Sequence, residues 1–267
     1  TGSFKPRGAI NKLHHLTEKE RKKGVITISA GNLAQGLAYA ASLLGTSATV
    51  VMPHTTPPNK VNAAEGYGAE VVLTGGDLLA TCLEVQKERN LTFVHPFDDP
   101  HMVAGHGTIG LEILEDLPEV DVIFVPVGGG GLISGIATAV KLKKLAVKIV
   151  GVEPVGASAM WRSLQQRTVV HLDRMDTVAD GLAAPFVGEL NLASVQEYVD
   201  ELVLVSDDEI IQALCLILER CKLLTEPAGA AGFAALLFEK AKIPGGSETV
   251  CVLSGGNIDL SRLGTFL

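Results

Sequence analysis

Four short segments of this 267-residue chain carry residue types that could do chemistry together. The first, residues 1–9, contains Lys5, and the other three are uncharged loops at 29–32, 128–131 and 254–257. An amine, a Ser/Asn loop, a run of glycines and a late serine could together hold a small molecule. That molecule would carry an aldehyde, an anionic group and a ring nitrogen.

The glycine run is the clearest of these segments. An apolar run at 122–127 leads into it, and a helical pattern follows at 132–145. Successive glycines let backbone N–H groups point inward together, and the helix N-terminus adds partial positive charge. The run therefore predicts a phosphate seat, although a tight turn in an α/β crossover would look the same in isolation. Its residues are Gly128, Gly129, Gly130 and Gly131.

Lys5 lies among small and apolar residues, next to Phe4, and Pro6 suits the first turn of a following helix. An isolated lysine is usually a surface charge. A lysine in an apolar, glycine-lined pocket tends to be neutral, because burial disfavours the ammonium. A neutral amine can form a Schiff base with an aldehyde. Phe4 could pack beside a planar ring or belong to the core.

The loop of Ser29, Ala30, Gly31 and Asn32 follows a predicted strand and precedes a predicted helix. Its N–H groups and the Ser29 hydroxyl could bind a carboxylate at the helix N-terminus, and the Asn32 amide could donate to a ring oxygen. Ser and Asn are also favoured as ordinary N-caps, so this loop alone leaves both interpretations open.

Ser254 ends a predicted buried strand and enters a Gly-Gly-Asn turn. A hydroxyl in that position needs a hydrogen-bonding partner, and a pyridine nitrogen would serve. Without the other segments, the same residues would be an ordinary strand-to-helix turn. Taken together, the amine, the phosphate seat and this hydroxyl predict pyridoxal phosphate (PLP).

Composition excludes several other functions. The formal net charge of −8 argues against nucleic acid as the main partner. Residues 24–59 contain no Asp, Glu, Lys or Arg, but Gly, Ser, Asn, Gln and Pro interrupt them too often for a membrane span. The four scattered cysteines are expected to be reduced core thiols of a cytoplasmic protein. A hydrophobic content of 47% is ample for a buried core.

Apolar runs alternate with helical patterns along the chain, which predicts an α/β fold with mostly parallel sheets and right-handed crossovers. We expect a smaller lobe at 1–101 and a larger one at 102–267, with a Pro- and Asp-rich crossover at 90–101. Asp77 is expected to cap a helix, and a capping box begins another at Ser206. Neither internal repeats nor low-complexity tracts are visible. Strands are expected at 25–28, 48–52, 70–73, 122–127, 148–152, 202–205 and 249–253, and helices at 32–44, 58–67, 78–89, 102–117, 132–145 and 227–242.

The chain resembles the fold-type-II PLP enzymes, and among them the serine/threonine dehydratases. It is most similar to the short catabolic-type threonine dehydratases, which lack a regulatory domain. The family's chain begins about fifty residues earlier, and this sequence opens without Met, so we expect an N-terminal segment to be missing. The matching motifs occur in order at 1–9, 29–36, 95–100, 104–112, 126–135, 178–181, 226–230 and 254–260.

The resemblance implies a fold of two lobes, each with a mostly parallel sheet flanked by helices, and it implies roles by position. Lys5 would bond PLP and act as the base at Cα, and Phe4 would lie against the cofactor ring. Asn32 would bond the ring hydroxyl, residues 128–131 would hold the phosphate, and Ser254 would face the pyridine nitrogen.

The substrate would be held by the neighbouring loop. Ser29, a further catalytic candidate, would bind the substrate carboxylate with Ala30, Gly31 and Asn32. Glu226 would contact the substrate, and Asp180 would lie near the site. These roles make the substrate a free amino acid, and the resemblance also implies a homo-oligomer.

The predicted reaction converts a β-hydroxy amino acid, L-threonine or L-serine, to a 2-oxo acid and ammonia. A hydroxyl at Ser254 cannot keep the pyridine nitrogen protonated as a carboxylate would, which favours β-elimination over transamination. Serine racemases of this family carry a second serine where this chain has Ala30. Because Ala30 has no proton to give, elimination is expected rather than racemisation.

Rival functions remain open on the same scaffold. A cysteine synthase-like β-replacement enzyme, a serine racemase and a metabolite-binding pseudoenzyme are the alternatives. A nicotinamide-binding protein would explain the glycine run and nothing else. The preference among threonine, serine and hydroxyaspartate is not predicted, because one methyl group is worth only about 1–3 kcal/mol in a pocket.

A cation site is the last expectation. Glu153 and the carbonyl of Ala157 could bind a monovalent or divalent cation, as the racemase-like metal site does. Ala159 stands where that site has a carboxylate, which makes a divalent ion doubtful. His106 stands where many relatives have Gln, and no effect is predicted for it.

Overall fold

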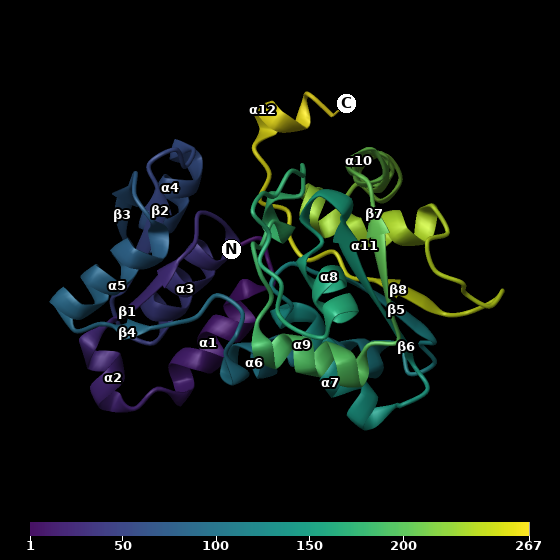
Figure 1. Ribbon diagram of the computed structural model, residues 1–267, viewed down its shortest axis with the longest axis horizontal. Helices are drawn as coiled ribbons and strands as arrows, with labels where there is room; N and C mark the ends of the chain where they lie inside the picture. The colour runs from purple at the N-terminus through teal and green to yellow at the C-terminus, as the bar shows by residue number, and fades with distance from the viewer. Residues whose placement is uncertain (267) are drawn as a thin grey trace. The chain divides into compact units, whose positions relative to one another are not determined.

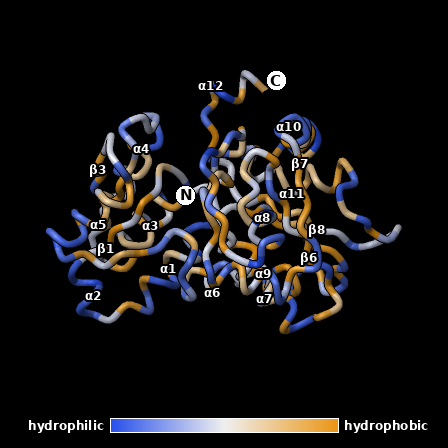
Figure 2. The backbone as a smooth tube through the Cα atoms, viewed as in Figure 1, coloured by the Kyte–Doolittle hydropathy of each residue, from blue (hydrophilic) through white to orange (hydrophobic). Residues whose placement is uncertain are grey.

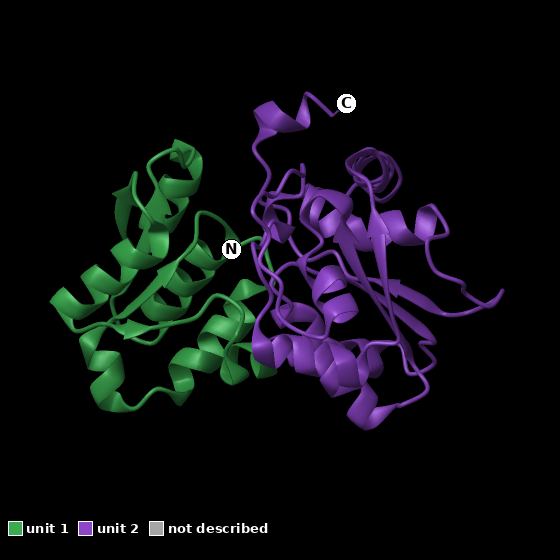
Figure 3. Cartoon of the chain, viewed as in Figure 1, with its two compact units in different colours: residues 1–105 green, residues 106–267 purple. Residues whose placement is uncertain are grey.

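The computed structural model describes residues 1–266, which divide into two compact units (Figure 3). Unit 1 is Thr1–Gly105, and unit 2 begins at His106. The division falls inside helix α6 (Pro100–Asp116), whereas the sequence placed it after His101. Each unit contains one four-stranded sheet with parallel pairing throughout.

The sheet of unit 1 has the order β3-β2-β1-β4 (Figure 1). Val25 pairs with Ala48 on one side and with Thr92 on the other, so β1 lies inside the sheet. Its strands are β1 (Val25–Ile28), β2 (Ala48–Pro53), β3 (Glu70–Thr74) and β4 (Thr92–Phe93).

Helices α1 and α3 pack closely against each other in unit 1. Alanines and leucines of α3 are buried, because an alanine-rich face lets two helices approach. Helix α2 contains only charged residues, and Figure 2 shows it in the hydrophilic colour. A capping box of Thr17 and Glu20 begins it. The helices are α1 (Lys5–His15), α2 (Glu18–Lys23), α3 (Asn32–Leu43), α4 (Pro58–Gly66) and α5 (Leu78–Arg89).

The sheet of unit 2 has the order β7-β6-β5-β8. All five residues of β5 are buried, as expected for a parallel strand covered on both faces. The strands are β5 (Val122–Pro126), β6 (Lys148–Pro154), β7 (Glu201–Val205) and β8 (Thr249–Cys251). The helical segments are α7 (Gly131–Lys143), η1 (Val155–Ala157), α8 (Ala159–Gln166), η2 (Asp180–Leu182), α9 (Glu189–Tyr198), α10 (Asp207–Leu216), η3 (Ile217–Cys221), α11 (Pro227–Leu237) and α12 (Leu260–Leu263).

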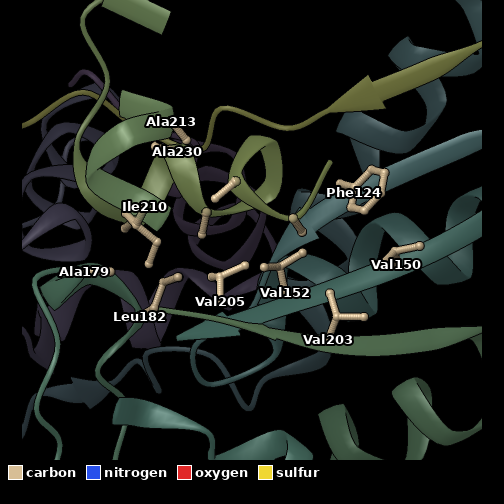
Figure 4. Packing of buried hydrophobic residues seen from close by; sticks show 14 of the residues in the cluster. Phe124, Val150, Val152, Ala179, Leu182, Val203, Val205, Ile210, Ala213 and Ala230 are labelled. Carbon is tan, nitrogen blue, oxygen red and sulfur yellow. The ribbon is translucent and has the colours of Figure 1, made fainter. Parts of the chain in front are cut away.

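The main core of unit 2 lies between its sheet and the helices α10 and α11 (Figure 4). Side chains of Phe124, Val152 and Val205 from three strands meet Ile210 of α10 and Ala230 of α11. Helix α11 consists almost entirely of small and apolar residues, so it can lie close to the strands. Burial of these side chains is the main source of stability for the unit.

Helix α10 begins at a capping box of Ser206 and Glu209 and changes its winding near the end. The segment that directly follows it, η3 (Ile217–Cys221), is a π-helix. Lys222 then ends the helix in the left-handed conformation, with φ of 59°. The chain reaches the predicted Glu226 loop a few residues later.

All seven predicted strands are confirmed, with ends that are unchanged or shifted by at most two residues. Helix α11 was predicted to reach Lys242, and that boundary is wrong: the helix ends at Leu237. Glu239 has a φ of 50°, which stops the helix before Pro244. The short strand β4 and helices α8 and α9 were not predicted. Among residues 1–266, no helix is both long and apolar enough to cross a bilayer.

Candidate active site

Lys5 is the first residue of α1 and directly follows Phe4, which is the N-cap. Helix α3 holds it from one side, because a Cβ on Gly36 would lie only 2.9 Å from the Lys5 Cβ. Pro6 occupies the first turn, where its missing N–H costs nothing. The closeness of the two helices thus fixes the backbone from which the Lys5 side chain extends.

A second glycine fixes the next residues of α1. A Cβ on Gly105, in α6, would overlap the Arg7 carbonyl oxygen and would lie 2.7 Å from the Gly8 Cα. The Lys5 Nζ lies 5.0 Å from the centre of the Phe4 ring. The predicted ring-stacking residue and the predicted amine are therefore neighbours in space as well as in sequence.

The loop of Ser29, Ala30, Gly31 and Asn32 joins β1 to α3 and is half-buried. The Gly31 N–H donates to the Ser29 Oγ at 3.2 Å, and the Ser29 N–H donates to the Val51 carbonyl at 3.2 Å. Because the Ser29 hydroxyl accepts a bond within the loop, its own proton can be donated to a ligand. The first turn of α3 has no acidic residue that would oppose an anion.

Unit 1 brings its predicted site residues together. Asn32 begins α3, and Gly36, which touches Lys5, lies four residues further along the same helix. Four residues of α-helix rise by about 6 Å, so the amine-bearing residue and the loop are one helical turn apart. The predicted amine and the predicted carboxylate-binding loop are thus close to each other in unit 1.

The motif beginning at His95 forms a turn after β4. The His95 Nδ1 accepts hydrogen bonds from the Asp98 N–H at 2.8 Å and from the Phe97 N–H at 3.3 Å. Burial lowers the pKa of His95, although Asp98 and Asp99 act in the opposite direction. A neutral ring is the form that can accept both bonds, so this histidine stabilises the turn.

In unit 2 the glycine run joins β5 to α7. Gly130 is the N-cap of α7 with φ of 92°, a conformation that side chains other than glycine rarely adopt. A Cβ on Gly130 would also lie 2.8 Å from both the Asn191 Cβ and the Met160 Cε. A Cβ on Gly128 would lie 3.2 Å from the Leu182 Cα. The first turn of α7 has no acidic residue, which suits a phosphate.

Asn191, on α9, was not predicted as a site residue. It is fully buried, and its Nδ2 donates to the Gly129 carbonyl at 2.8 Å across 62 positions of sequence. The Ser134 hydroxyl, in the first turn of α7, lies 3.4 Å from the Asn191 carbonyl oxygen and donates to it. The only sequence signal is a polar residue beside the buried Leu192 and Val195 on one helix.

Ser254 is buried, but β8 ends at Cys251 and is itself only half-buried, so the prediction of a buried strand that ends at Ser254 is wrong in that part. Its loop is tied to the Glu226 loop, because the Glu226 N–H donates to the Gly255 carbonyl at 3.0 Å. The buried Thr225 hydroxyl donates to the same carbonyl at 2.8 Å, and Thr225 was also missed by the sequence analysis. The Glu226 loop and the Ser254 loop, which are distant in sequence, are thus joined by two hydrogen bonds to the Gly255 carbonyl.

The Asp180 motif lies beside the Glu226 motif. A Cβ on Gly181 would lie 2.9 Å from the Ala228 Cβ and 3.9 Å from the Glu226 Oε1. Leu182, next in sequence, contacts Gly128. Unit 2 therefore gathers the glycine run, the Glu226 loop and the Ser254 loop. The Asp180 carboxylate is partly exposed and lies 3.6 Å from the Arg262 guanidinium.

Glu153 has a different environment from the one expected of a metal ligand. Its two carboxylate oxygens accept the N–H groups of Met160 at 2.8 Å and Trp161 at 2.7 Å, at the start of α8. Burial raises its pKa to about 8 against the effect of these bonds. Ala157 is buried nearby in η1. Among residues 1–266, no group of three or more His, Cys, Asp or Glu side chains could hold a metal.

These two sets of residues fit PLP. Unit 2 has a glycine turn that side chains would block, at a helix N-terminus, together with the buried hydroxyl of Ser254 in the loop after β8. Unit 1 has an amine beside an aromatic ring, and a loop that leads into a helix N-terminus without acidic residues in its first turn. A divalent cation fits poorly, because the single carboxylate offered by Glu153 already accepts two N–H groups.

Comparison with known proteins supports this chemistry. The family model described as pyridoxal-phosphate dependent enzyme matches residues 1–255. An L-threonine ammonia-lyase of Thermotoga maritima is 46% identical over 266 residues, and one of Geobacter sulfurreducens is 50% identical over 266 residues. Each alignment covers 98% of this chain and 66% of the relative, so the chain spans slightly less than two thirds of either protein.

Two solved structures have the same fold. The processed form of threonine deaminase isoform 2 from Solanum lycopersicum has a TM-score of 0.93 and 42% identity, covering 99% of this chain and 78% of that one. Maize serine racemase has a TM-score of 0.94 and 36% identity, covering 99% of this chain and 82% of that one. Fold similarity alone therefore does not separate elimination from racemisation.

Proposed function

Because the chain belongs to the pyridoxal-phosphate-dependent enzymes, we propose that it converts a β-hydroxy amino acid, L-threonine or L-serine, to a 2-oxo acid and ammonia. The observation that carries the proposal is that every required group is present: the Lys5 amine, the glycine turn and the buried Ser254 hydroxyl. The L-threonine ammonia-lyases that match 98% of the chain support the same reaction.

PLP, when bound, supplies an aldehyde that links to amines and a ring that withdraws electrons from the amino-acid Cα. The N–H groups of residues 128–131 would hold its phosphate at the start of α7. The Ser254 hydroxyl would face the ring nitrogen, the Asn32 amide would face the ring hydroxyl, and Phe4 would lie against the ring. Lys5 would provide the covalent link.

The substrate would be oriented by unit 1. The Ser29 hydroxyl and the N–H groups of the loop that includes Ala30, Gly31 and Asn32 would hold its carboxylate, and Glu226 of unit 2 would contact its polar groups. The Lys5 Nζ would then remove the proton from Cα, a step that a positioned base typically accelerates by about 10²–10⁴-fold. The electrons of the broken Cα–H bond would form a Cα=Cβ double bond as the bond from Cβ to the hydroxyl breaks. The hydroxyl would take up the proton that Lys5 removed and leave as water. A water molecule would then hydrolyse the resulting enamine to the 2-oxo acid and ammonia.

Racemisation is the second candidate, because maize serine racemase has the same fold. It requires a proton donor on the opposite face of Cα. The methyl group of Ala30 has no proton to donate, so Ala30 favours elimination. The two reactions differ in product, since elimination gives pyruvate from L-serine and racemisation gives D-serine.

We further propose a homo-oligomer that works in the cytoplasm. Leu142 and Leu145, near the end of α7, are 71% and 76% exposed, and exposed apolar residues are common at subunit interfaces. All four cysteines are free thiols, which suits a reducing compartment. If a cation binds near Glu153 and Ala157, a monovalent ion suits the single carboxylate better than a divalent one.

The test is 2-oxo acid release from L-threonine, L-serine and a hydroxyaspartate, with PLP supplied. Lys5→Ala is expected to lower turnover about 10³-fold, because it removes both the link and the base. Lys22→Ala is the matched control, since Lys22 is exposed and pairs with Glu18 on the same helix, α2. It is expected to leave turnover unchanged.

Other outcomes would replace the proposal. Substantial D-serine with slow pyruvate release would identify a racemase. Thiol-dependent consumption of O-acetylserine would identify a β-replacement enzyme. PLP binding without turnover of any of these amino acids would support a metabolite-binding protein that keeps the scaffold.

A further inference from the structure

The peptide bond between Gly129 and Gly130 has one side fixed by the protein. The bond is trans, as are all the others described, so its C=O and N–H point in opposite directions. The Gly129 carbonyl accepts hydrogen bonds from the Asn191 Nδ2 at 2.8 Å and from the Gly188 N–H at 3.3 Å. Both donors belong to the start of α9, so the Gly130 N–H points away from that helix.

Asn191 can hold this carbonyl firmly because its own position is fixed. The residue is 0% exposed, and helix α9 packs against α7. The Ser134 hydroxyl donates to its backbone carbonyl at 3.4 Å, and its Cβ would lie 2.8 Å from a Cβ on Gly130. A buried amide with these contacts cannot rotate away without losing its bond to the Gly129 carbonyl, which would keep only the longer bond from the Gly188 N–H.

We propose that Asn191 is a positioning residue for phosphate: by holding the Gly129 carbonyl, it keeps the Gly130 N–H aimed at the anion. This inference rests on the proposed function, in which residues 128–131 bind the phosphate of PLP. Glycine peptides rotate easily, because no Cβ restricts them. Without Asn191, the same peptide can turn its carbonyl oxygen toward the anion, where it would repel the phosphate.

The test compares PLP with pyridoxal, which has the same aldehyde and ring but no phosphate. Both can link to Lys5, so the ratio of their dissociation constants isolates the contribution of the phosphate. The full chain is freed of cofactor and titrated with each compound, following the change in protein fluorescence or cofactor absorbance. Wild-type protein is expected to bind PLP much more tightly than pyridoxal.

Asn191→Leu keeps the volume approximately and removes the donor. We expect the PLP dissociation constant to rise about tenfold, as for loss of one hydrogen bond that supports a charged group, with the pyridoxal value within about twofold of wild type. Ser194→Ala is the matched control, because the Ser194 hydroxyl donates to the Leu190 carbonyl on the same helix at 2.9 Å. It should leave both constants unchanged.

The possible results distinguish failure of the role of Asn191 from failure of PLP binding at the glycine run. If wild-type protein binds PLP no more tightly than pyridoxal, the glycine run is not a phosphate seat and both ideas fall. If wild type discriminates and Asn191→Leu does so equally, or if Asn191→Leu weakens both compounds equally, Asn191 has no role in phosphate binding. Should Asn191→Leu fail to fold, Asn191→Asp keeps the shape while replacing the donor by an acceptor, and the same loss of discrimination is expected.

Discussion

The two units have the same strand order although their sequences show no repeat. The order β3-β2-β1-β4 in unit 1 corresponds, strand for strand along the chain, to β7-β6-β5-β8 in unit 2. In each, the first strand is followed by a loop and a helix, at the place where the strand order reverses. Parallel sheets bind ligands at this position, and both anion-binding loops predicted from the sequence occur there.

The two loops differ in how they are held. In unit 1 the Ser29 hydroxyl accepts the Gly31 N–H inside the loop, and a Cβ on Gly31 would meet nothing within 4 Å. In unit 2 the loop is held from outside by Asn191, and Gly130 has no room for a Cβ. An open loop suits a substrate that comes and goes, whereas a crowded loop suits a cofactor that stays.

The loops after β4 and β8 are alike in that each contains a carbonyl that accepts a hydrogen bond from a buried threonine. The buried Thr27 hydroxyl donates to the Val94 carbonyl after β4 at 2.8 Å, and the buried Thr225 hydroxyl donates to the Gly255 carbonyl after β8 at 2.8 Å. Their surroundings differ, because Ser254 precedes Gly255 whereas His95 follows Val94. The same anchoring bond thus supports a candidate cofactor residue in one unit and a structural turn in the other.

The loops after β1 and β5 predict the largest difference in stability between matched glycine variants. Gly130→Ala should destabilise unit 2 by about 3 kcal/mol, through the positive φ and the contacts with Asn191 and Met160, and should abolish PLP binding. Gly31→Ala should change the free energy of unfolding by less than about 1 kcal/mol. Chemical denaturation and PLP titration measure both. Equal destabilisation by the two variants would contradict the distinction between an open and a crowded loop.

Buried carboxylates give the units opposite responses to pH, and Glu153 of unit 2 has the larger effect. Its pKa is about 8 in the folded protein against an ordinary 4.5, so between these values the unfolded chain has lost a proton that the folded chain keeps. The free energy of unfolding therefore falls as pH rises from 4.5 to 8. Glu153→Gln cannot titrate and should flatten this dependence of the free energy of unfolding on pH.

Denaturation of Glu153→Gln and wild type across this range measures the effect. The variant loses one acceptor for the α8 N–H groups, so a uniform loss of stability at every pH is expected as well. A pH dependence identical to that of wild type would show that Glu153 is ionised in the folded protein.

The paired threonines predict a smaller and more selective effect. Thr225→Val and Thr27→Val should each cost about 1–1.5 kcal/mol, because each removes the hydrogen bond that a buried hydroxyl donates to a loop carbonyl. Only Thr225→Val should also weaken PLP binding, since it loosens the loop that carries Ser254. Thr225→Ser keeps the donor and should restore binding. Equal effects of Thr225→Val and Thr27→Val on PLP affinity would remove the difference between these loops.

Asp99 of unit 1 predicts the smallest effect, with the opposite sign to Glu153. Burial would raise its pKa, but the Lys12 ammonium at 2.5 Å and the N–H groups of Met102 and His101 outweigh burial and lower it. Its contribution is present above an ordinary pKa of 3.8 and is lost as pH falls through the folded value. Asp99→Asn should cost about 0.5–1 kcal/mol at neutral pH and reduce acid sensitivity.

Hydrogen exchange measured separately in β1 and β5 would assign the pH dependence from Asp99 to unit 1 and that from Glu153 to unit 2. Protection in β1 should fall in acid, and protection in β5 should fall as pH rises toward 8 in wild type. An acid sensitivity of β1 that survives Asp99→Asn would point to another carboxylate.

The strand order along the chain was predictable because short apolar runs are separated by glycine, asparagine and proline. The loops that carry the candidate site residues were predictable for the same reason, since Gly130 and Asn32 mark where strands end and helices begin. Strand β4 was not, because two residues are too few to show alternation. Helix α11 was predicted too long because its sequence contains no breaker before Pro244.

Residues that act through tertiary contacts were outside the reach of local patterns. Asn191 reaches Gly129 across 62 positions, and Thr225 reaches Gly255 across 30, so neither contact leaves a signal in its own segment. Glu153 could be noticed as an acidic residue at the end of an apolar strand. Its hydrogen bonds to the start of α8 depend on a turn, η1, that no sequence pattern indicated.

The orientation of Glu226 depends on the number of residues in the π-helical segment Ile217–Cys221. A π turn closes its hydrogen bond over one more residue than an α turn does. Removing a single residue there would let α10 close regularly and would rotate the next segment of the chain by about 100° around the helix axis. The Glu226 side chain, a few residues further along the chain, would then point in another direction. The additional residue of the π turn therefore helps to set the orientation of Glu226.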